Sequence, residues 1–205
     1  MIKAAPRVGK SLNVNESSSR PARERLLAAA SELFYQEGVQ SVGIDKIIER
    51  AGVAKASLYG NFKGKDDLVR AYLEARHDAR RAAIEAQIAR REAPRDKLLA
   101  VFDASAEAMS QPNYRGCAFL RASAEMPENA SGRAVCRNVR RWLRELLTRL
   151  AKDAGAAKPE VLAHQLQLLY DGTAASGQMD GDSAAAIRAK AAAALLVDAA
   201  IVKRS

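Results

Sequence analysis

The stretch 41–65 constrains this chain most, because it predicts two helices joined by a tight turn. It reads SVGIDKIIERAGVAKASLYGNFKGK. Apolar residues recur at helical spacing in its first half, and Gly52 interrupts them where a left-handed turn residue is needed. The pattern resumes at Lys55, and Leu58 and Phe62 share one face of the second helix. We therefore predict a helix-turn-helix unit.

The outward side chains of the second helix are short, polar or basic. Such a surface suits a helix that enters the DNA major groove, because small side chains let its backbone approach the base edges. Tyr59 and Lys65 would contact phosphates, and Lys55 and Ser57 would read bases. The candidate DNA-contacting residues are Ser41, Lys55, Ala56, Ser57, Tyr59, Gly60, Asn61 and Lys65.

The string AGVAKASLYGNFKGKDDL, residues 51–68, resembles the DNA-binding segment of the TetR family of bacterial transcriptional repressors. Matching segments extend over residues 23–73. Two positions depart from the family pattern, since Gly43 and Ala54 stand where the family usually has Ser or Thr caps. Loss of a side-chain cap to Ala costs on the order of 1 kcal/mol. We therefore expect the second helix of the motif to fray until DNA holds it.

The rest of the sequence predicts an all-α protein of about nine helices. Alanine is abundant, and aromatic residues make up only 5% of the chain. Apolar periodicity, prolines and glycines place the helices. Besides 44–51 and 55–62, helices are expected at 21–38, 65–93, 94–109, 116–126, 131–154, 160–178 and 183–202.

Three regions are expected along the chain. Residues 1–20 are polar and without periodicity, which predicts a disordered basic arm that either lies along DNA or is a solvated tail. Residues 21–66 are expected to form a three-helix DNA-binding head, and the resemblance implies that residues 67–205 form a second domain for effector binding and dimerisation. The core of the head is expected to contain Leu27, Phe34, Val42, Ile47, Ile48, Val53, Leu58 and Phe62.

In the second domain, His77 is predicted to be a surface side chain. Five arginines between residues 137 and 149 fall on the outward face of an amphipathic helix, which favours a solvated surface.

The resemblance implies a homodimer in which helices 160–178 and 183–202 pair with their copies. An intramolecular helix pair is the alternative. A symmetric dimer matches a palindromic operator in double-stranded DNA, because each head covers one half-site.

The resemblance also implies a pocket for an unknown small-molecule effector. An inducer would tilt the helix that starts at Lys65 and separate the two heads, which releases a repressor from its operator. The candidate lining residues are bulky or adaptable apolar side chains, each of which packed core explains equally well. They are Phe102, Met109, Phe119, Met126, Trp142 and Tyr170.

Other function classes have little support in the sequence. Cys117, Cys136 and the two histidines have no metal-ligand spacing, and no pattern of catalytic residues or phosphate-binding loop is present, so we expect no metal, no cofactor and no enzyme. No apolar run reaches the length of a membrane span, and the N-terminus lacks the apolar core of a signal peptide, which predicts a soluble cytoplasmic protein. The net charge of +9 fits a polyanionic partner. The alternative function is a DNA-binding regulator without an effector, either constitutive or switched by oxidation of a thiol such as Cys117.

Overall fold

The computed structural model describes residues 20–201, and within that range the chain consists of nine helices without a β-strand. The predicted all-α class is therefore confirmed. Most of the predicted basic arm at residues 1–20, and the end of the predicted helix 183–202, lie outside the described residues.

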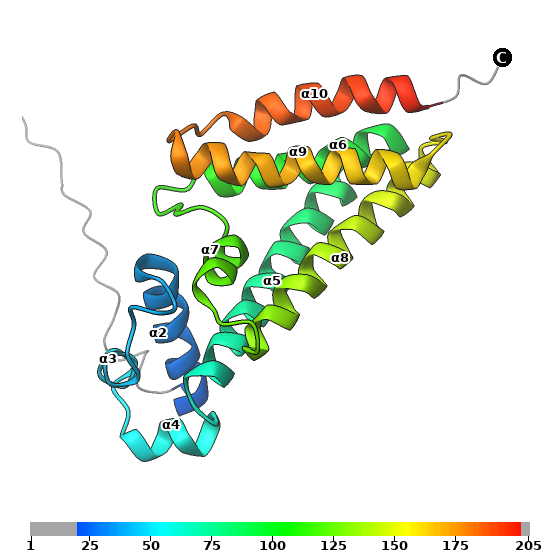
Figure 1. Ribbon diagram of the computed structural model, residues 1–205. Helices are drawn as coiled ribbons and strands as arrows, with labels where there is room; N and C mark the ends of the chain where they lie inside the picture. Colours follow the sequence, from blue (N-terminus) through cyan, green and yellow to red (C-terminus); the bar gives the residue numbers. More distant parts are fainter. Residues whose placement is uncertain (1–19, 202–205) are drawn as a thin grey trace, which may run out of the picture.

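The helices follow the predicted order along the chain (Figure 1). They are α2 (Ala22–Glu37), α3 (Ile44–Ala51), α4 (Lys55–Asn61), α5 (Lys65–Ala89), α6 (Pro94–Met109), α7 (Ala118–Glu125), α8 (Ser131–Asp153), α9 (Pro159–Met179) and α10 (Ala185–Ala200).

Local sequence explains most helix boundaries. Pro94 and Pro159 occupy first helical positions, where their missing N–H costs nothing. The predicted helix 116–126 begins two residues late, because Gly116 has a φ of 88° that a right-handed helix does not allow. Ala130 is the residue that precedes α8, and Ser131 is the first helical residue.

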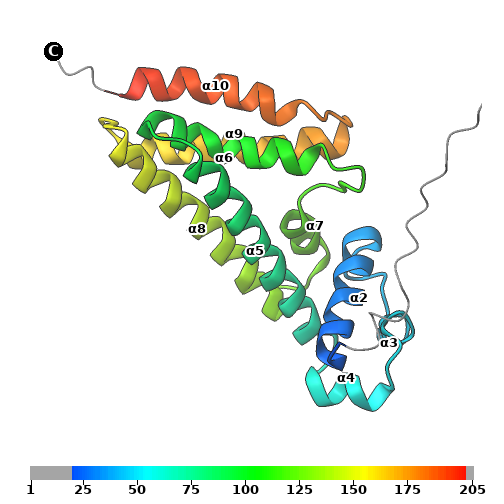
Figure 2. The same ribbon diagram turned by 180° about the vertical axis from the view of Figure 1, so that it is seen from behind.

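The molecule has a head, made of α2, α3 and α4, and a body, made of α5 to α10. α2, α3 and α4 form the head at one end, and α5 and α8 lie side by side as they run from the head to the other end (Figures 1 and 2). There α6, α9 and α10 pack together, and α7 lies between α2 and the α5–α8 pair. α5 therefore connects the head directly to the body.

A first buried cluster holds the head together and continues into α7 and the start of α8. It contains most of the predicted core, but Leu26 is fully buried where Leu27 was expected. The reason is helical phase, since Leu26 shares the inward face of α2 with Ala30 and Leu33. Leu27, Ile48 and Val53 are only partly buried at the edge of the cluster.

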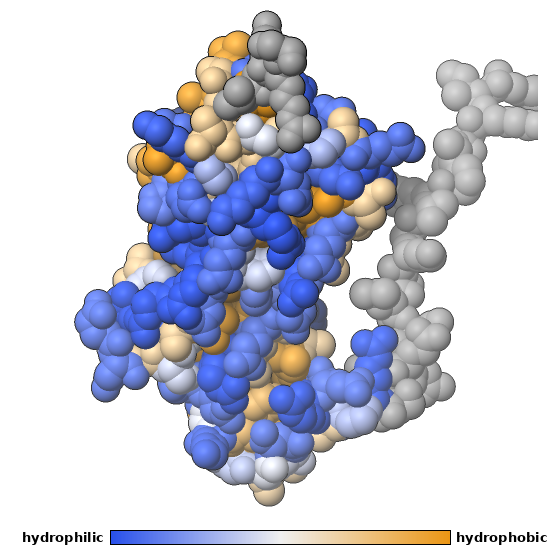
Figure 3. All heavy atoms as spheres, turned by 90° about the vertical axis from the view of Figure 1, so that its right-hand side faces the viewer, coloured by the Kyte–Doolittle hydropathy of each residue, from blue (hydrophilic) through white to orange (hydrophobic). Residues whose placement is uncertain are grey.

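A second buried cluster fills the body between α5, α6, α8, α9 and α10. The arginines Arg137, Arg140, Arg141, Arg144 and Arg149 of α8 are exposed, as predicted. The side of the molecule along α8 is mostly hydrophilic, with apolar side chains visible between polar ones (Figure 3).

The prediction of a surface position for His77 holds only in part, because this side chain is partly buried. Its ring packs edge-on against Trp142 with 5.2 Å between ring centroids. Nδ1 of His77 is buried and has no hydrogen-bond partner within residues 20–201. Burial lowers the pKa of His77, an effect that Arg80 and Arg81 reinforce and Asp78 opposes.

Two further observations concern residues 20–201 as a whole. None of the helices there combines the length and apolar character that a bilayer crossing requires. The same residues contain no group of three His, Cys, Asp or Glu side chains placed to hold a metal ion.

Candidate DNA-binding surface and internal cavity

The turn between α3 and α4 is built as the sequence predicts. Gly52 has φ 59° and ψ 44°, in the left-handed region that glycine adopts without steric cost. Its N–H contacts the carbonyls of Ile48 and Glu49, and Val53 N–H donates to Ile48 O at 3.3 Å. Arg25 of α2 donates from Nη1 to Gly52 O at 3.1 Å. The turn is therefore fixed to the head and sets the direction of α4.

Helix α4 is anchored by its inner face and exposed on the others. Leu58 is fully buried, and Phe62, directly after the helix, is buried with the guanidinium of Arg23 5.2 Å from its ring centroid. Tyr59 is 55% exposed. No side chain caps the N-terminus of α3 or α4 at Gly43 or Ala54, which agrees with the weak caps expected from the sequence. Fraying of α4 stays a prediction.

Most of the candidate DNA-contacting residues lie on this exposed surface. The exposed ones are Ser41, Lys55, Ala56, Tyr59, Gly60 and Asn61, whereas Ser57 and Lys65 are partly buried. Three of these side chains already have partners within the head. Lys55 pairs with Asp45 at 3.2 Å, and Asn61 Nδ2 donates to Ser57 O at 2.7 Å. Lys65 Nζ donates to Gln40 O at 3.1 Å, and burial lowers the pKa of Lys65.

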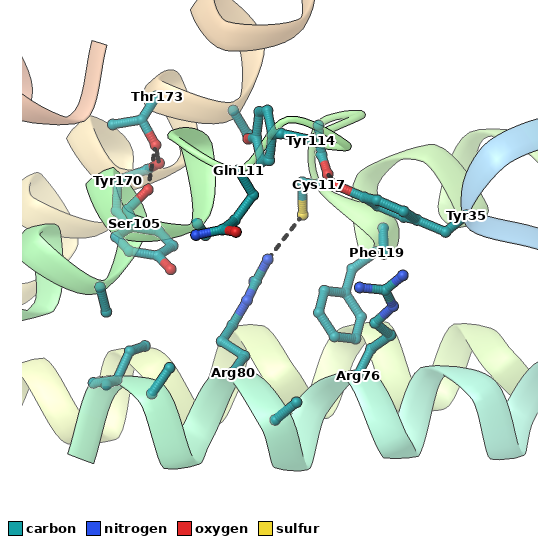
Figure 4. Close-up of a pocket in the computed structure, with 18 of the residues that line it drawn as sticks. Tyr35, Arg76, Arg80, Ser105, Gln111, Tyr114, Cys117, Phe119, Tyr170 and Thr173 are labelled. Carbon is teal, nitrogen blue, oxygen red and sulfur yellow. Dashed lines mark hydrogen bonds between the residues drawn. The ribbon is translucent and has the colours of Figure 1, made fainter. Parts of the chain in front are cut away.

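A cavity of about 300 Å³, partly open to solvent, lies where the head meets the body (Figure 4). Its wall combines side chains of α2, α5, α6, α7 and α9 with the segment between α6 and α7. The larger lining side chains are Tyr35, Arg76, Arg80, Gln111, Tyr114, Phe119 and Tyr170.

Two of the six predicted lining residues, Phe119 and Tyr170, line this cavity. The other four lie elsewhere. Phe102 is fully buried beside Tyr170, and Met109 packs with Ala185 and Ala186. Met126 belongs to the cluster of the head, and Trp142 packs on His77.

The polar lining residues were not singled out from the sequence. Tyr35 Oη donates to Gly116 O at 3.1 Å and accepts from Arg115 N–H at 2.9 Å. Burial raises the pKa of Tyr114 to about 12. No local motif marks these residues, because each is one polar side chain on an amphipathic helix or in a loop. A polar residue facing inward on α5 was the only available signal, and it requires knowledge of the helix packing.

The two cysteines have different environments, and neither forms a disulfide. Cys136 is buried and donates from Sγ to Phe119 O at 3.6 Å, and burial raises the pKa of its thiol. Cys117 is partly buried in the wall of the cavity.

Several hydrogen bonds connect the wall of the cavity to the head through α7. Gln40 N–H donates to Glu125 Oε2 at 2.9 Å, and Gln40 Nε2 donates to Glu125 O at 2.7 Å. Arg121 Nη1 donates to Tyr35 O at 2.6 Å. Tyr35 itself is a residue of α2 that lines the cavity. The head and the cavity therefore share side chains and backbone contacts.

The outer surfaces of α9 and α10 carry large apolar side chains. On α9 these are Val161, Leu168 and Met179, seven and eleven residues apart, which corresponds to about two and three helical turns. Leu168 is 71% exposed and Met179 is 83% exposed. Ile187 and Leu195 are exposed on α10, about two turns apart. These side chains give α9 and α10 an apolar surface that is exposed in the described part of the chain, residues 20–201.

Known proteins with this arrangement are transcriptional regulators. Residues 26–72 match the family described as bacterial regulatory proteins, tetR family. The crystal structure of SCO4454, a TetR-family transcriptional regulator from Streptomyces coelicolor, is 30% identical, with a TM-score of 0.83 over 93% of this chain and 97% of that chain. A putative TetR-family regulator from Streptomyces avermitilis is 31% identical, with a TM-score of 0.76 over 88% of this chain and 98% of that chain.

Curated relatives match mainly through the head. The HTH-type transcriptional activator FasR of Mycolicibacterium smegmatis is 45% identical over 56 residues, which are 27% of this chain and 26% of that protein. The HTH-type transcriptional repressor NemR of Escherichia coli is 28% identical over 115 residues, 55% of this chain and 58% of that protein. The chain thus spans about a quarter of FasR and somewhat more than half of NemR. These relatives are regulators rather than enzymes, and they include both an activator and a repressor.

Proposed function

The chain belongs to the TetR family of DNA-binding transcriptional regulators, and on that premise we propose that it is a dimeric repressor that a small molecule releases from a palindromic operator. The observation that carries this proposal is the construction of the cavity. One of its lining side chains, Tyr35, belongs to the DNA-binding head. A molecule bound there contacts the head directly.

In the proposed complex, α4 enters the major groove. Lys55 and Ser57 reach base edges, and Tyr59 and Lys65 contact phosphates, since a phenol hydroxyl and an ammonium fix position without reading sequence. Lys65 uses one of its three N–H donors on Gln40 O, which leaves two for a phosphate oxygen. Ser41, Ala56, Gly60 and Asn61 complete the proposed contact surface.

The proposed dimer forms through α9 and α10, in agreement with the segments 160–178 and 183–202 expected from the sequence. The support is an exposed apolar surface on these helices, made of Val161, Leu168, Met179, Ile187 and Leu195. Contact of this surface with water is unfavourable, and its burial against a second copy of the chain is favourable. A twofold dimer places two heads on two half-sites with centres about 34–36 Å apart, or a multiple of that distance. Residues 21–66 and 67–205 remain the proposed division into head and second domain.

In the proposed release mechanism, a ligand in the cavity favours a spread arrangement of the two heads. Ordinary allosteric coupling requires that the ligand bind the spread form better by ~1–3 kcal/mol. The route runs from the wall of the cavity through Tyr35 into α2 and through α7 to Gln40, because those contacts join the wall to the head.

Selection of bound sites from random duplex DNA with the full-length protein tests the proposal. We expect an inverted repeat whose half-site spacing reports the dimer, and a monomer in sedimentation or a site without symmetry would contradict it. Within the selected site, Lys65→Ala should weaken binding to all sequences and reduce the salt slope by about 1, whereas Ser57→Ala should change base preference. Tyr59→Phe is the matched phosphate-contact variant that leaves the fold untouched, since Tyr59 is exposed.

A second candidate function is a regulator that responds to oxidation. Cys117 supports it, because its thiol lies in the wall of the same cavity and accepts a contact from Arg80 Nη2 at 3.4 Å. DNA affinity measured before and after hydrogen peroxide, in the protein and in Cys117→Ser, separates the two functions. A loss of affinity that Cys117→Ser abolishes would favour the oxidation switch.

A further inference from the structure

Two arginines of α5 project into the cavity from successive turns of the helix. Figure 4 shows Arg76 and Arg80 extending from α5 into the same space. Within residues 20–201, neither guanidinium forms an ion pair with a carboxylate. Arg70 and Arg81 on the same helix do, with Asp67 and Glu74 for the first and Glu85 for the second. The pairing of α5 arginines is thus absent only where the helix faces the cavity.

The partners that Arg76 and Arg80 do have are aromatic rings and a thiol. Arg76 lies over the ring of Tyr35, 4.0 Å from its centroid. Arg80 lies over the ring of Phe119 at 4.6 Å and donates to Cys117 Sγ at 3.4 Å, and sulfur is a weak acceptor. A guanidinium carries five N–H donors, and most of these donors have no acceptor within residues 20–201, so they can bind a ligand. A partly buried cation without an anion is also unfavourable, which makes an incoming anion a stabilising partner.

The acidic side chain in the wall does not neutralise these cations. Asp171 lines the cavity, but its Oδ2 lies 2.6 Å from Arg140 Nη1 on α8. The remaining polar groups of the wall are neutral hydroxyls and amides, among them Ser105, Thr173 and Gln111. Thr173 Oγ1 donates to Tyr170 O at 2.7 Å, so it is already satisfied within the protein. The cavity therefore carries a net positive charge on its α5 side.

We propose that the ligand of this cavity is a small amphipathic carboxylate whose anionic group binds Arg80 and Arg76. The proposal rests on the proposed function and specifies its effector. A carboxylate matches the planar fork of a guanidinium, whereas the aromatic wall of Phe119, Tyr114 and Tyr170 suits an apolar ring or short chain better than a strongly hydrated phosphate. About 300 Å³ lies at the small end of ligand pockets, which favours a compact molecule.

The same geometry explains how binding of the anion affects the head. Arg76 contacts the ring of Tyr35, and a carboxylate competes with that ring for the guanidinium. Occupation of the site thereby changes the contact that holds α2 against α5.

The experiment uses the full-length protein and matched pairs of probes, namely benzoate with benzamide, cinnamate with cinnamamide, and octanoate with octanamide. Binding is measured by calorimetry and by thermal shift without DNA. We expect at least one acid to bind and its amide to bind roughly 10- to 100-fold more weakly, because a hydrogen bond to a charged group is the stronger one. Acids that bind no better than their amides, or no acid that binds, would overturn the proposal.

Variants then locate the anion. Arg80→Gln should weaken the acid by roughly 10-fold or more and leave the amide unchanged, whereas Arg81→Gln, one residue away, exposed and paired with Glu85, should behave like the parent protein. Arg80→Lys keeps the charge without the fork, so it should bind the acid with intermediate affinity, and it serves as the test if Arg80→Gln fails to fold by circular dichroism. If either Arg80→Gln or Arg80→Lys bound the acid as tightly as the parent protein does, the assignment of the anion to Arg80 would be contradicted.

Measurements of DNA binding distinguish a failure of the anion site from a failure of the proposed function. Gel shifts on the selected operator are run with the binding acid. An acid that binds the protein through Arg80 but does not release DNA would support the anion site and count against release by a ligand. A neutral molecule that releases DNA while no acid binds would leave the repressor function intact and overturn the anion site.

Discussion

The head and the cavity gather their functional residues in different ways. The candidate DNA-contacting residues lie between Ser41 and Lys65, and six of the eight are on the short helix α4, with Ser41 before α3 and Lys65 at the start of α5. The lining of the cavity extends from Tyr35 to Ala174 and draws on five helices. A surface on one short helix depends on local order, whereas a cavity depends on how distant helices pack. The two regions should therefore respond differently to substitutions.

Truncation of the core of the head should have the largest effect. Leu58 is fully buried on the inner face of α4, so Leu58→Ala should lower the free energy of unfolding by about 2–5 kcal/mol and remove DNA binding. Urea denaturation and gel shifts measure both effects. Leu120→Ala, at an exposed leucine of α7, is the control and should change stability little. Full DNA affinity in Leu58→Ala would show that the contact surface does not depend on the core of the head.

Removal of one hydroxyl should weaken the coupling between ligand binding in the cavity and DNA binding by the head. Tyr35→Phe keeps the ring but loses the hydrogen bonds to Gly116 O and from Arg115 N–H, at a cost of about 1–3 kcal/mol. We expect ligand binding to persist while DNA release by that ligand weakens by roughly fivefold or more. Calorimetry and gel shifts with the same ligand measure the two quantities. Unchanged release would show that coupling bypasses Tyr35.

Addition of a helix cap should change the head alone. Ala54 precedes α4 with extended backbone and no side-chain cap, so Ala54→Ser offers an oxygen to the N–H of Ala56 or Ser57. We expect about 1 kcal/mol of added stability in α4 and slower hydrogen exchange there without DNA. Ala130→Ser, at the cap position of α8, is the matched control outside the helix-turn-helix. No change in exchange at α4 would argue that the helix does not fray.

The smallest predicted effect is a pH dependence that arises in the body. Burial lowers the pKa of His77 in the folded state, so the unfolded chain binds more protons as pH falls below the ordinary value of 6.5. Stability from this group is complete above that pH and is lost as pH decreases toward the folded pKa. His77→Phe keeps an aromatic ring against Trp142 and should flatten the stability profile between about pH 7 and pH 5, whereas His164→Phe, at an exposed histidine, should not. A profile that His77→Phe leaves unchanged would assign the dependence to other groups.

The head was predictable in detail because its signals are local. Gly52 indicates a left-handed turn, and the apolar spacing around it defines the inward faces of two helices. Gly43 and Ala54 predict helix starts without a side-chain cap. Even the error at Leu27 is small, since Leu26 and Leu27 are adjacent and the helical face differs by one position.

The cavity was predictable only in part because large apolar side chains resemble core. Phe119 and Tyr170 line it, but Phe102 and Met126 pack into the two buried clusters. A periodic sequence shows that a side chain faces inward. It does not show whether that side chain packs against another one or lines an open cavity. Arg76 and Arg80 were missed for a related reason, since an arginine on a polar stretch of helix predicts a solvated face.

The sequence by itself determined the all-α class, the order of the helices and the helix-turn-helix, because periodicity, prolines and glycines act on the nearest turns of the chain. Only the tertiary structure decided that Tyr35 of the head lines the cavity and that Arg76 and Arg80 extend into it without a carboxylate. The physical reason is that a cavity and its charge depend on the packing of α2, α5, α7 and α9 against one another. No single segment of the chain carries that information.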